Sequence, residues 1–392
     1  MSALILPFLA ILGSITAVAG LSLFVYKLIR HRRERFDEFR RASYIGALSE
    51  MATRSGYPLE MLRRWSPDGV FLETLLEFLK FLQGGERQNL LRLARELGIV
   101  ERFVNELRTS TRRNKRVEAV KALAEFADPA SADALLETLK DPVDEVRWQG
   151  AGALAKIGDP RAVRPLLETL QRETDWGANR IADTLVAFGS TAVPDLARYA
   201  LLSDPVLSAN AAHLPLIARV LGIIGDVRAE PAMLSALEAD DAELRIRAAA
   251  ALGTVGSLTC VPPLIRTLRD PEWEVRAQAA AALGRQMDGR AIEGLRRSMR
   301  DENWWVRQNS AQALSEIPGG ITALVGGLED EDRFARDASI ERLMAMGLVR
   351  KAVEAVKGGS AGEQDRFVVR QMVVLGRGEY LRDKAADEKV AG

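Results

Sequence analysis

The hydrophobic positions of this chain recur at a fixed step over most of its length. A short apolar segment that reads ALAEFAD at 122–128 returns as ALAKIGD at 153–159 and as ALGRQMD at 282–288. Seven such segments follow one another, with offsets of 31, 31, 36, 31, 31 and 31 residues. A fixed period of this size indicates stacked copies of one supersecondary unit, each of which buries its apolar face against its neighbours.

One copy of the repeat, residues 270–300, is predicted to contain two short helices. Val275, Ala279 and Leu283 fall on one face of a helix over 274–284, because helical neighbours recur every three to four residues. Met-Asp-Gly then breaks the helix, and a second helix is predicted up to residue 299. The sequence therefore predicts an all-α fold, an α-solenoid of helix pairs with a period of 31 residues.

Two motifs of the repeat resemble those of a known family. The motif Asp-Pro-x-x-Glu-Val-Arg stands at 141–147 and 270–276, and Gly-Asp-x-Arg-Ala stands at 158–162 and 225–229. Both resemble the HEAT repeat, specifically the variant found in phycobilin lyases, and the likeness covers roughly 112–348. The resemblance implies an α-solenoid of HEAT-like helix pairs. It implies no single activity, because that repeat serves lyases, scaffolds and adaptors alike.

The N-terminal residues form a long apolar stretch. Residues 3–29 are apolar or small until Lys27 and Arg30, a length that can cross a hydrocarbon core of ~30 Å. A secretory signal is the rival interpretation, but it would carry positive charge before the apolar stretch. Because the basic residues follow it, we expect a single transmembrane helix with everything after it in the cytoplasm. The expected domains are a transmembrane anchor at 1–30, a juxtamembrane basic helix and linker at 31–64, a HEAT-repeat α-solenoid at 65–376, and a polar, disordered tail at 377–392.

Two segments depart from the simple repeat. Residues 69–82 are apolar on almost every side, which predicts a helix buried in the first layers of the stack, with a partner-binding or membrane-dipping helix as the alternative. The enlarged step of 36 residues places Pro215 where a helix is expected. Since proline inside a helix removes a hydrogen bond, this predicts a bend or loosening of the stack there.

Composition limits the chemistry that the chain can carry. The 54 basic and 54 acidic residues balance, which argues against a nucleic-acid binder that must neutralise many phosphates. Cys260 is the one cysteine, and His31 and His213 are the two histidines. Neither a multi-cysteine metal site nor a histidine-based catalytic pair fits such a composition. We therefore expect no catalytic residue, no cofactor and no metal.

Most charged residues that stand out fall in repeat slots. An aspartate precedes several predicted helices, where its side chain can accept from free N–H groups. An arginine follows six residues later, and we expect it to bond to neighbouring loops. These slots hold Asp141, Asp270 and Asp301, and Arg147, Arg276 and Arg307.

Tryptophans near the helix starts have no obvious place in a core of Ala, Leu and Val. Trp273 and Trp304 share one slot, and Trp305 stands one residue later. They either pack over the loops between helices or form an exposed edge together with the neighbouring arginines. Because Trp and Arg are typical interface anchors, the sequence predicts a partner-binding edge of Trp273, Arg276, Trp304, Trp305 and Arg307.

These observations favour a non-catalytic, membrane-anchored scaffold. Its cytoplasmic solenoid would bind or regulate a protein partner, such as a membrane enzyme. The resemblance leaves an alternative, a bilin-lyase-like enzyme or chaperone module that uses its concave surface as a ligand pocket. A nucleic-acid reader is the third class, and the balanced charge argues against it.

Overall fold

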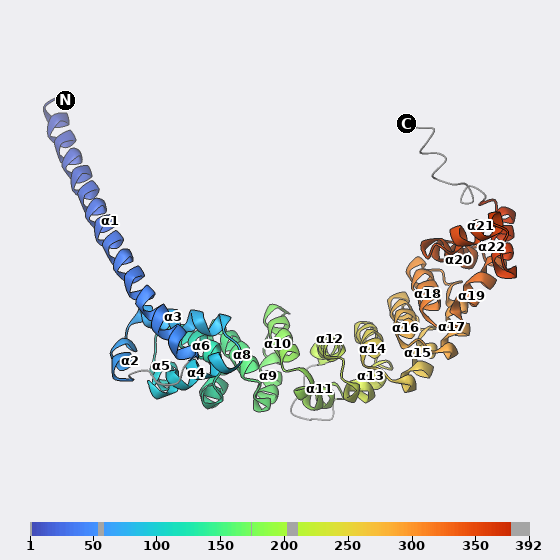
Figure 1. The fold of residues 1–392 in the computed structure, drawn as a ribbon, viewed down its shortest axis with the longest axis horizontal. Helices are drawn as coiled ribbons and strands as arrows, with labels where there is room; N and C mark the ends of the chain where they lie inside the picture. The colour runs from blue at the N-terminus through green and yellow to red at the C-terminus, as the bar shows by residue number, and fades with distance from the viewer. Residues whose placement is uncertain (1, 54–58, 174, 202–210, 378–392) are drawn as a thin grey trace. The chain divides into compact units, whose positions relative to one another are not determined.

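The computed structural model describes residues 2–53, 59–173, 175–201 and 211–377, apart from the side chains of 2–23, 25, 28, 29, 33, 175 and 211. Over these residues every regular element is an α-helix or a short 3-10 helix, and no strand occurs (Figure 1). The all-α fold expected from the sequence is therefore confirmed. The chain divides into two compact units, Met1–Asp159 and Pro160–Gly392.

The first unit opens with one long helix, which is followed by shorter helices. Its elements are α1 (Ser2–Thr53), α2 (Leu59–Trp65), α3 (Gly69–Phe81), α4 (Gly84–Glu96), α5 (Ile99–Thr109), α6 (Arg113–Phe126), η1 (Pro129–Ser131), α7 (Ala132–Thr138) and α8 (Asp144–Ile157). Helices α6 and α8 pack side by side, and α3 and α5 each contact α6. The helix predicted over 69–82 is α3, and it buries one face while Phe81 at its end stays exposed.

The C-terminal part of α1 packs against α3 and α4. Tyr44 is buried there, and its ring lies 4.9 Å from that of Trp65 and 5.4 Å from that of Phe71. The Tyr44 hydroxyl donates to Oδ2 of Asp68 at 2.9 Å. Asp68 also accepts from an N–H in the first turn of α3 and so caps that helix. The packed fold therefore begins within residues 31–64, which the sequence predicts to be a juxtamembrane helix and linker.

The predicted membrane span and the predicted tail lie largely outside the residues and side chains that the structure describes. For most of residues 3–29 the side chains are not among those described, although α1 runs unbroken from Ser2 to Thr53. Among the described residues, no helix combines the length and the apolar character needed to cross a bilayer. The tail predicted over 377–392 lies outside the described residues from 378 onward.

The second unit repeats the helix pair. Its elements are η2 (Pro160–Ala162), α9 (Val163–Leu170), α10 (Asp175–Ala187), η3 (Gly189–Thr191), α11 (Val193–Ala200), η4 (Ala211–His213), α12 (Leu214–Ile224), η5 (Val227–Ala229), α13 (Glu230–Ala236), α14 (Ala242–Val255), η6 (Leu258–Cys260), α15 (Val261–Thr267), α16 (Trp273–Gln286), η7 (Gly289–Ala291), α17 (Ile292–Ser298), α18 (Trp304–Glu316), α19 (Gly320–Gly326), η8 (Gly327–Glu329), α20 (Arg333–Ala345), α21 (Leu348–Lys357) and α22 (Glu363–Val374).

The longer helices of the second unit stand in one row and the shorter ones in another. Figure 1 shows α12, α14, α16 and α18 side by side, with α13, α15 and α17 in the second row. Small residues permit this close packing: Ala279 and Ala282 of α16 are fully buried. At Gly284 a Cβ would lie only 2.9 Å from the Cα of Ala313 on α18. The Ala-rich pattern of the sequence thus sets the distance between neighbouring repeats.

Several longer helices end at a residue with positive φ. Gly158 and Gly225 adopt φ of 73° and 71°, as glycine does readily. In the same repeat slot Ala127 and Met287 have φ of 48° and 51°. The break predicted at Met-Asp-Gly is therefore confirmed, and both Ala127 and Met287 end their helices in a conformation that is strained for a residue with a Cβ.

Pro215 starts a helix and does not interrupt one. It lies in the first turn of α12, where the missing proline N–H would have no helical partner in any case. Pro215 therefore lies in a helix, as expected, but at a position where it does not interrupt that helix. The rest of the enlarged step, residues 202–210, lies outside the described residues.

Candidate partner-binding site

Arginine–aspartate pairs hold the loops of consecutive repeats together. Arg276 on α16 donates from Nε and Nη2 to the two carboxylate oxygens of Asp301 at 2.7 and 2.9 Å. The same bidentate arrangement, again 25 residues apart, is found in Arg245–Asp270 and Arg116–Asp141. Paired guanidinium and carboxylate groups of this geometry are strong and directional contacts. Of the three arginines expected to bond to neighbouring loops, Arg276 forms such a pair, whereas Arg147 and Arg307 donate to carbonyl oxygens just before their own helices.

Both partners of the Arg276–Asp301 pair also bond within their own loops. Asp301 accepts from the N–H of Asn303 at 2.9 Å. Arg276 donates from Nη1 to the carbonyl oxygens of Asp270 and Pro271 at 2.9 and 3.0 Å. Hydrogen bonding to Asp301 raises the pKa of Arg276. The aspartate therefore supports the start of the next helix, although the capping residue itself is Asn303.

The predicted binding edge divides into buried and exposed members. Arg276 is 8% exposed and uses all three of its guanidinium nitrogens inside the stack. It is therefore not available to a partner, although the sequence predicts it in the binding edge. Trp273 at the start of α16 is half-buried. Of these two residues, Arg276 serves the stack.

Trp304 and Trp305 lie on the surface at the start of α18. They are 48% and 56% exposed, and their rings meet edge to face with centroids 4.8 Å apart. Asn303 accepts from the N–H of Trp305 at 2.9 Å and fixes this helix start. The cap fixes the backbone of this helix start, and much of the surface of both indoles stays in water.

Three further residues extend this surface. The Arg307 guanidinium carbon lies 4.6 Å from the ring centroid of Phe334 on α20, and that of Arg333 lies 5.1 Å from the same ring. Arg307 also donates to the carbonyl oxygens of Asp301 and Glu302. Phe334 is 42% exposed. We call the set Trp304, Trp305, Arg307, Arg333 and Phe334 the aromatic cluster.

The aromatic cluster contains residues that sequence reasoning missed. Phe334 follows Trp305 by 29 residues, which is the shortened step at which the repeat continues beyond α18. A search for aromatic residues at that step would therefore have found it. Arg307 differs from Arg276 in its contact: Arg307 stacks on the Phe334 ring, whereas Arg276 forms an ion pair with Asp301 of the next repeat.

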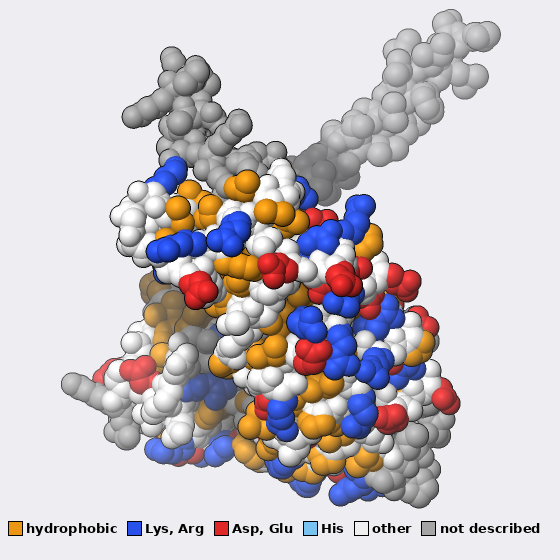
Figure 2. All heavy atoms as spheres, turned by 90° about the vertical axis from the view of Figure 1, so that its right-hand side faces the viewer, with side chains coloured by type: hydrophobic (Ala, Val, Ile, Leu, Met, Phe, Trp, Pro, Cys, Tyr) orange, Lys and Arg blue, Asp and Glu red, His pale blue; other side chains and the backbone are white. Residues whose placement is uncertain are grey.

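The face of the molecule drawn in Figure 2 is chemically mixed. Figure 2 shows Lys and Arg side chains interspersed with Asp and Glu side chains, and hydrophobic side chains between them. Among the described residues, no group of three or more His, Cys, Asp or Glu side chains is placed to hold a metal ion. On the face shown, charges of both signs meet a prospective partner.

Known families and structures are similar to this chain in its repeats. The family model of HEAT repeats matches residues 100–185 and 230–315. No curated protein matches the chain. Importin beta is 14% identical with a TM-score of 0.48, covering 86% of this chain and 52% of its own. An engineered protein is 21% identical to this chain with a TM-score of 0.35, and the match covers 79% of this chain and 95% of the engineered protein.

A third similar structure is the complex of CpcE and CpcF of phycocyanin lyase from Nostoc. It is 18% identical with a TM-score of 0.26, covering 70% of this chain and 94% of its own. Identities and TM-scores this low carry no information about activity or partners. The family match and the quoted motifs nevertheless agree on the nature of the repeat. The chain contains HEAT repeats over residues 100–185 and 230–315, and its repeats resemble the phycobilin-lyase type.

Proposed function

We propose that this protein is a non-catalytic scaffold whose HEAT repeats bind a protein partner. The observation that carries the proposal is the aromatic cluster. Trp304, Trp305 and Phe334 keep between 42% and 56% of their surface exposed at the starts of neighbouring helices. Large aromatic side chains gathered on a surface are characteristic of protein–protein contacts.

The geometry of the cluster suits an interface anchor. Trp offers a large contact area with few rotatable bonds, so little side-chain entropy is lost on binding. Arg307 lies over Phe334 and is already held by two carbonyl oxygens. A partner would therefore meet an Arg307 side chain that is already held in place, which lowers the entropic cost of association.

We also propose that residues 3–29 anchor the scaffold in a membrane, with the repeats on the cytoplasmic side. The support is the apolar length of this stretch and the basic residues at and after its C-terminal end, which include Lys27 and Arg30. A scaffold held at a membrane can keep a partner close to that surface, and a membrane enzyme is one partner of this kind.

The experiment is co-purification from the native host in mild detergent, followed by binding measurements with the identified partner. Trp304→Ala and Trp305→Ala are each expected to weaken binding by about 2 kcal/mol, or ~30-fold. Neither change should lower the melting temperature appreciably, because both side chains are about half exposed.

Phe81→Ala is the matched control, because Phe81 is an aromatic residue that is 83% exposed and lies on α3, outside the cluster. It should leave binding unchanged. If Trp304→Ala lowers the melting temperature and partner recovery stays intact, the tryptophans are structural and the proposal fails.

A further inference from the structure

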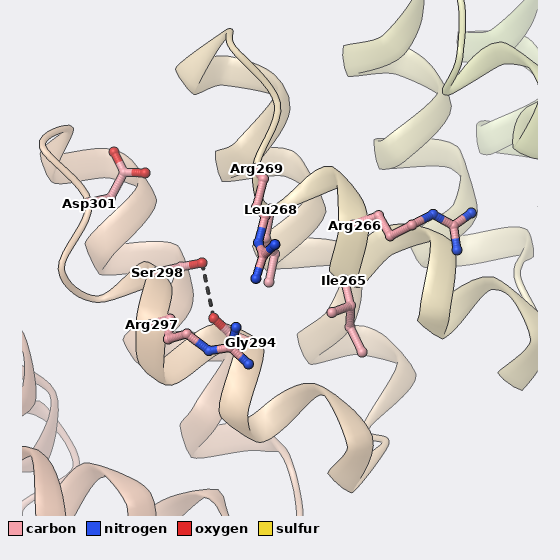
Figure 3. A pocket seen from close by; sticks show the side chains of 8 residues that line it. All are labelled: Ile265, Arg266, Leu268, Arg269, Gly294, Arg297, Ser298 and Asp301. Carbon is pink, nitrogen blue, oxygen red and sulfur yellow. Dashed lines mark hydrogen bonds between the residues drawn. The ribbon is translucent and has the colours of Figure 1, made fainter.

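A groove lies between α15 and α17, close to the aromatic cluster in sequence. Its volume is about 610 Å³, a size that accommodates a few side chains. Figure 3 shows the Arg269 and Arg297 side chains extending into it from the two helices. Ile265, Leu268 and Gly294 form an apolar part of the lining.

Gly294 keeps the groove open. A Cβ at this position would lie 3.1 Å from Cδ1 of Leu268 and 3.4 Å from Cγ2 of Ile265. A longer side chain here would occupy the space between the two helices. The glycine thus leaves room that a side chain from another molecule can enter.

The protein neutralises the positive charge of the groove only in part. The Arg269 side chain is exposed and forms no hydrogen bond or ion pair with any described residue. Arg297 donates to Glu293 at 3.2 Å, but Glu293 is shared with Arg296. Asp301, which also lines the groove, has both oxygens taken by Arg276. An incoming carboxylate would therefore meet guanidinium groups and no free anion.

The repeat itself does not require arginine at these positions. The slot of Arg297 holds Glu137 and Glu168 in earlier copies. The slot of Arg269 holds Gln171 and Glu238. Since the fold tolerates opposite or neutral charges in the same places, stacking does not explain why arginines gather in two consecutive copies.

We infer that this groove binds the carboxylate side chains of an acidic, partly apolar segment of the protein partner, which deepens the proposed scaffold function and rests on it. Guanidinium groups recognise carboxylates in directional, charge-assisted hydrogen bonds. Ile265 and Leu268 offer contact to apolar side chains of the same segment. Asp301 at the groove stands three residues before Trp304, so one segment can reach both the groove and the aromatic cluster.

A nucleic acid fits the groove less well than an acidic protein segment. Nucleic-acid affinity comes from neutralising many phosphates at once. The chain has as many acidic as basic residues, 54 of each, and the cations that line the groove are only Arg266, Arg269 and Arg297. Its apolar lining also has no counterpart in a phosphate backbone.

The test uses the full chain in a neutral detergent and a short fluorescent peptide that alternates Glu and Leu. Fluorescence polarisation should show that this peptide binds and that added salt weakens it. Its Gln/Leu counterpart should bind at least about 10-fold more weakly, because it lacks the charged hydrogen-bond acceptors. Arg269→Glu should weaken the Glu/Leu peptide by about 10-fold or more, and Arg269→Gln by less.

Lys140→Glu is the matched control, because Lys140 is exposed and occupies the slot of Arg269 in the first unit. It should leave peptide binding unchanged. The inference is overturned if the wild-type chain does not bind the Glu/Leu peptide, if the Gln/Leu peptide binds equally well, if Arg269→Glu has no effect, or if inorganic phosphate alone displaces the peptide as well as free peptide does. In each of these cases the partner recovery with Trp304→Ala still decides the scaffold function separately.

Discussion

Arg276 and Asp301 form a bidentate ion pair that joins the loop of one repeat to the loop of the next. Their side chains are only 10% and 11% exposed. Because the pair is largely withdrawn from water, removing one partner leaves the other charge unpaired in a poorly solvated place. The pair therefore differs in kind from the many ion pairs on the helix surfaces.

We predict that Arg276→Ala lowers the free energy of unfolding by about 3 kcal/mol, because it strands Asp301 and frees two loop carbonyl oxygens. Arg247→Ala is the control, since the pair of Arg247 with Glu243 is 44% and 49% exposed. It should cost less than about 1 kcal/mol. Urea unfolding followed by circular dichroism measures both, and equal losses would contradict the structural role of the ladder.

Met287→Gly is predicted to stabilise the second unit. Met287 ends α16 with φ of 51°, a conformation that costs a residue with a Cβ about 1 kcal/mol. Glycine removes that cost, so the melting temperature should rise. Gly225→Ala places a Cβ on the corresponding residue with φ of 71° and should lower it. A fall in melting temperature with Met287→Gly would show that the methionine side chain contributes more than its backbone costs.

Cys260 should be chemically inert in the folded protein. It is fully buried, and burial raises the pKa of its thiol to about 11. Because the thiolate is the reactive form, labelling by iodoacetamide at pH 8 should be slow and should accelerate with urea as the second unit unfolds. Rapid labelling without urea would contradict this packing.

The same thiol predicts a pH dependence of stability. Its folded pKa is raised, so the unfolded chain loses the thiol proton first as the pH rises. The free energy by which the buried, protonated thiol favours the folded state is fully present below the ordinary thiol pKa, and it is lost as the pH approaches 11. The melting temperature should therefore fall less steeply in Cys260→Ser than in the wild type over this alkaline range. Parallel curves for the two proteins would argue against the effect.

Membrane anchoring predicts a defined topology. A reporter fused to the C-terminus should be active only in the cytoplasm, and the protein should stay in the membrane fraction after carbonate washing. Deleting residues 2–29 should release it, because the apolar length available to span the bilayer is then lost. Release of the intact chain by carbonate, or a mature N-terminus beyond residue 20, would rule out an uncleaved anchor.

The repeat could be predicted from sequence because its signal is both periodic and local. Apolar residues such as Val275 and Leu283 recur at helical spacing in copy after copy, and both are fully buried in the structure. The helix ends could be predicted as well, because Gly158 and Gly225 mark them. Pro215 was harder, since the same residue either breaks a helix or starts one, and only the position of the first turn decides between them.

The candidate site could be predicted only in part. Arg276 and Arg307 occupy the same repeat slot, yet one pairs with Asp301 and the other stacks on Phe334. That difference depends on the residue contributed by the next repeat, which a single slot does not contain. No sequence motif marks the residues of the groove at Arg269 and Arg297. Its signal is the change from Glu168 to Arg297 within one slot, which appears only when the copies are compared position by position.

The ladder of loop pairs also bears on how such a chain can evolve. Asp270 and Asp301 occupy equivalent places, 25 residues after Arg245 and Arg276. If recombination removed residues 270–300, Arg245 would meet Asp301 at the same separation, and a duplication would add one more pair of the same kind. A gene of this design can gain or lose length in whole copies without creating an unmatched charge. The number of copies, and with it the reach of the binding surface, is then free to vary while each junction between copies is inherited intact.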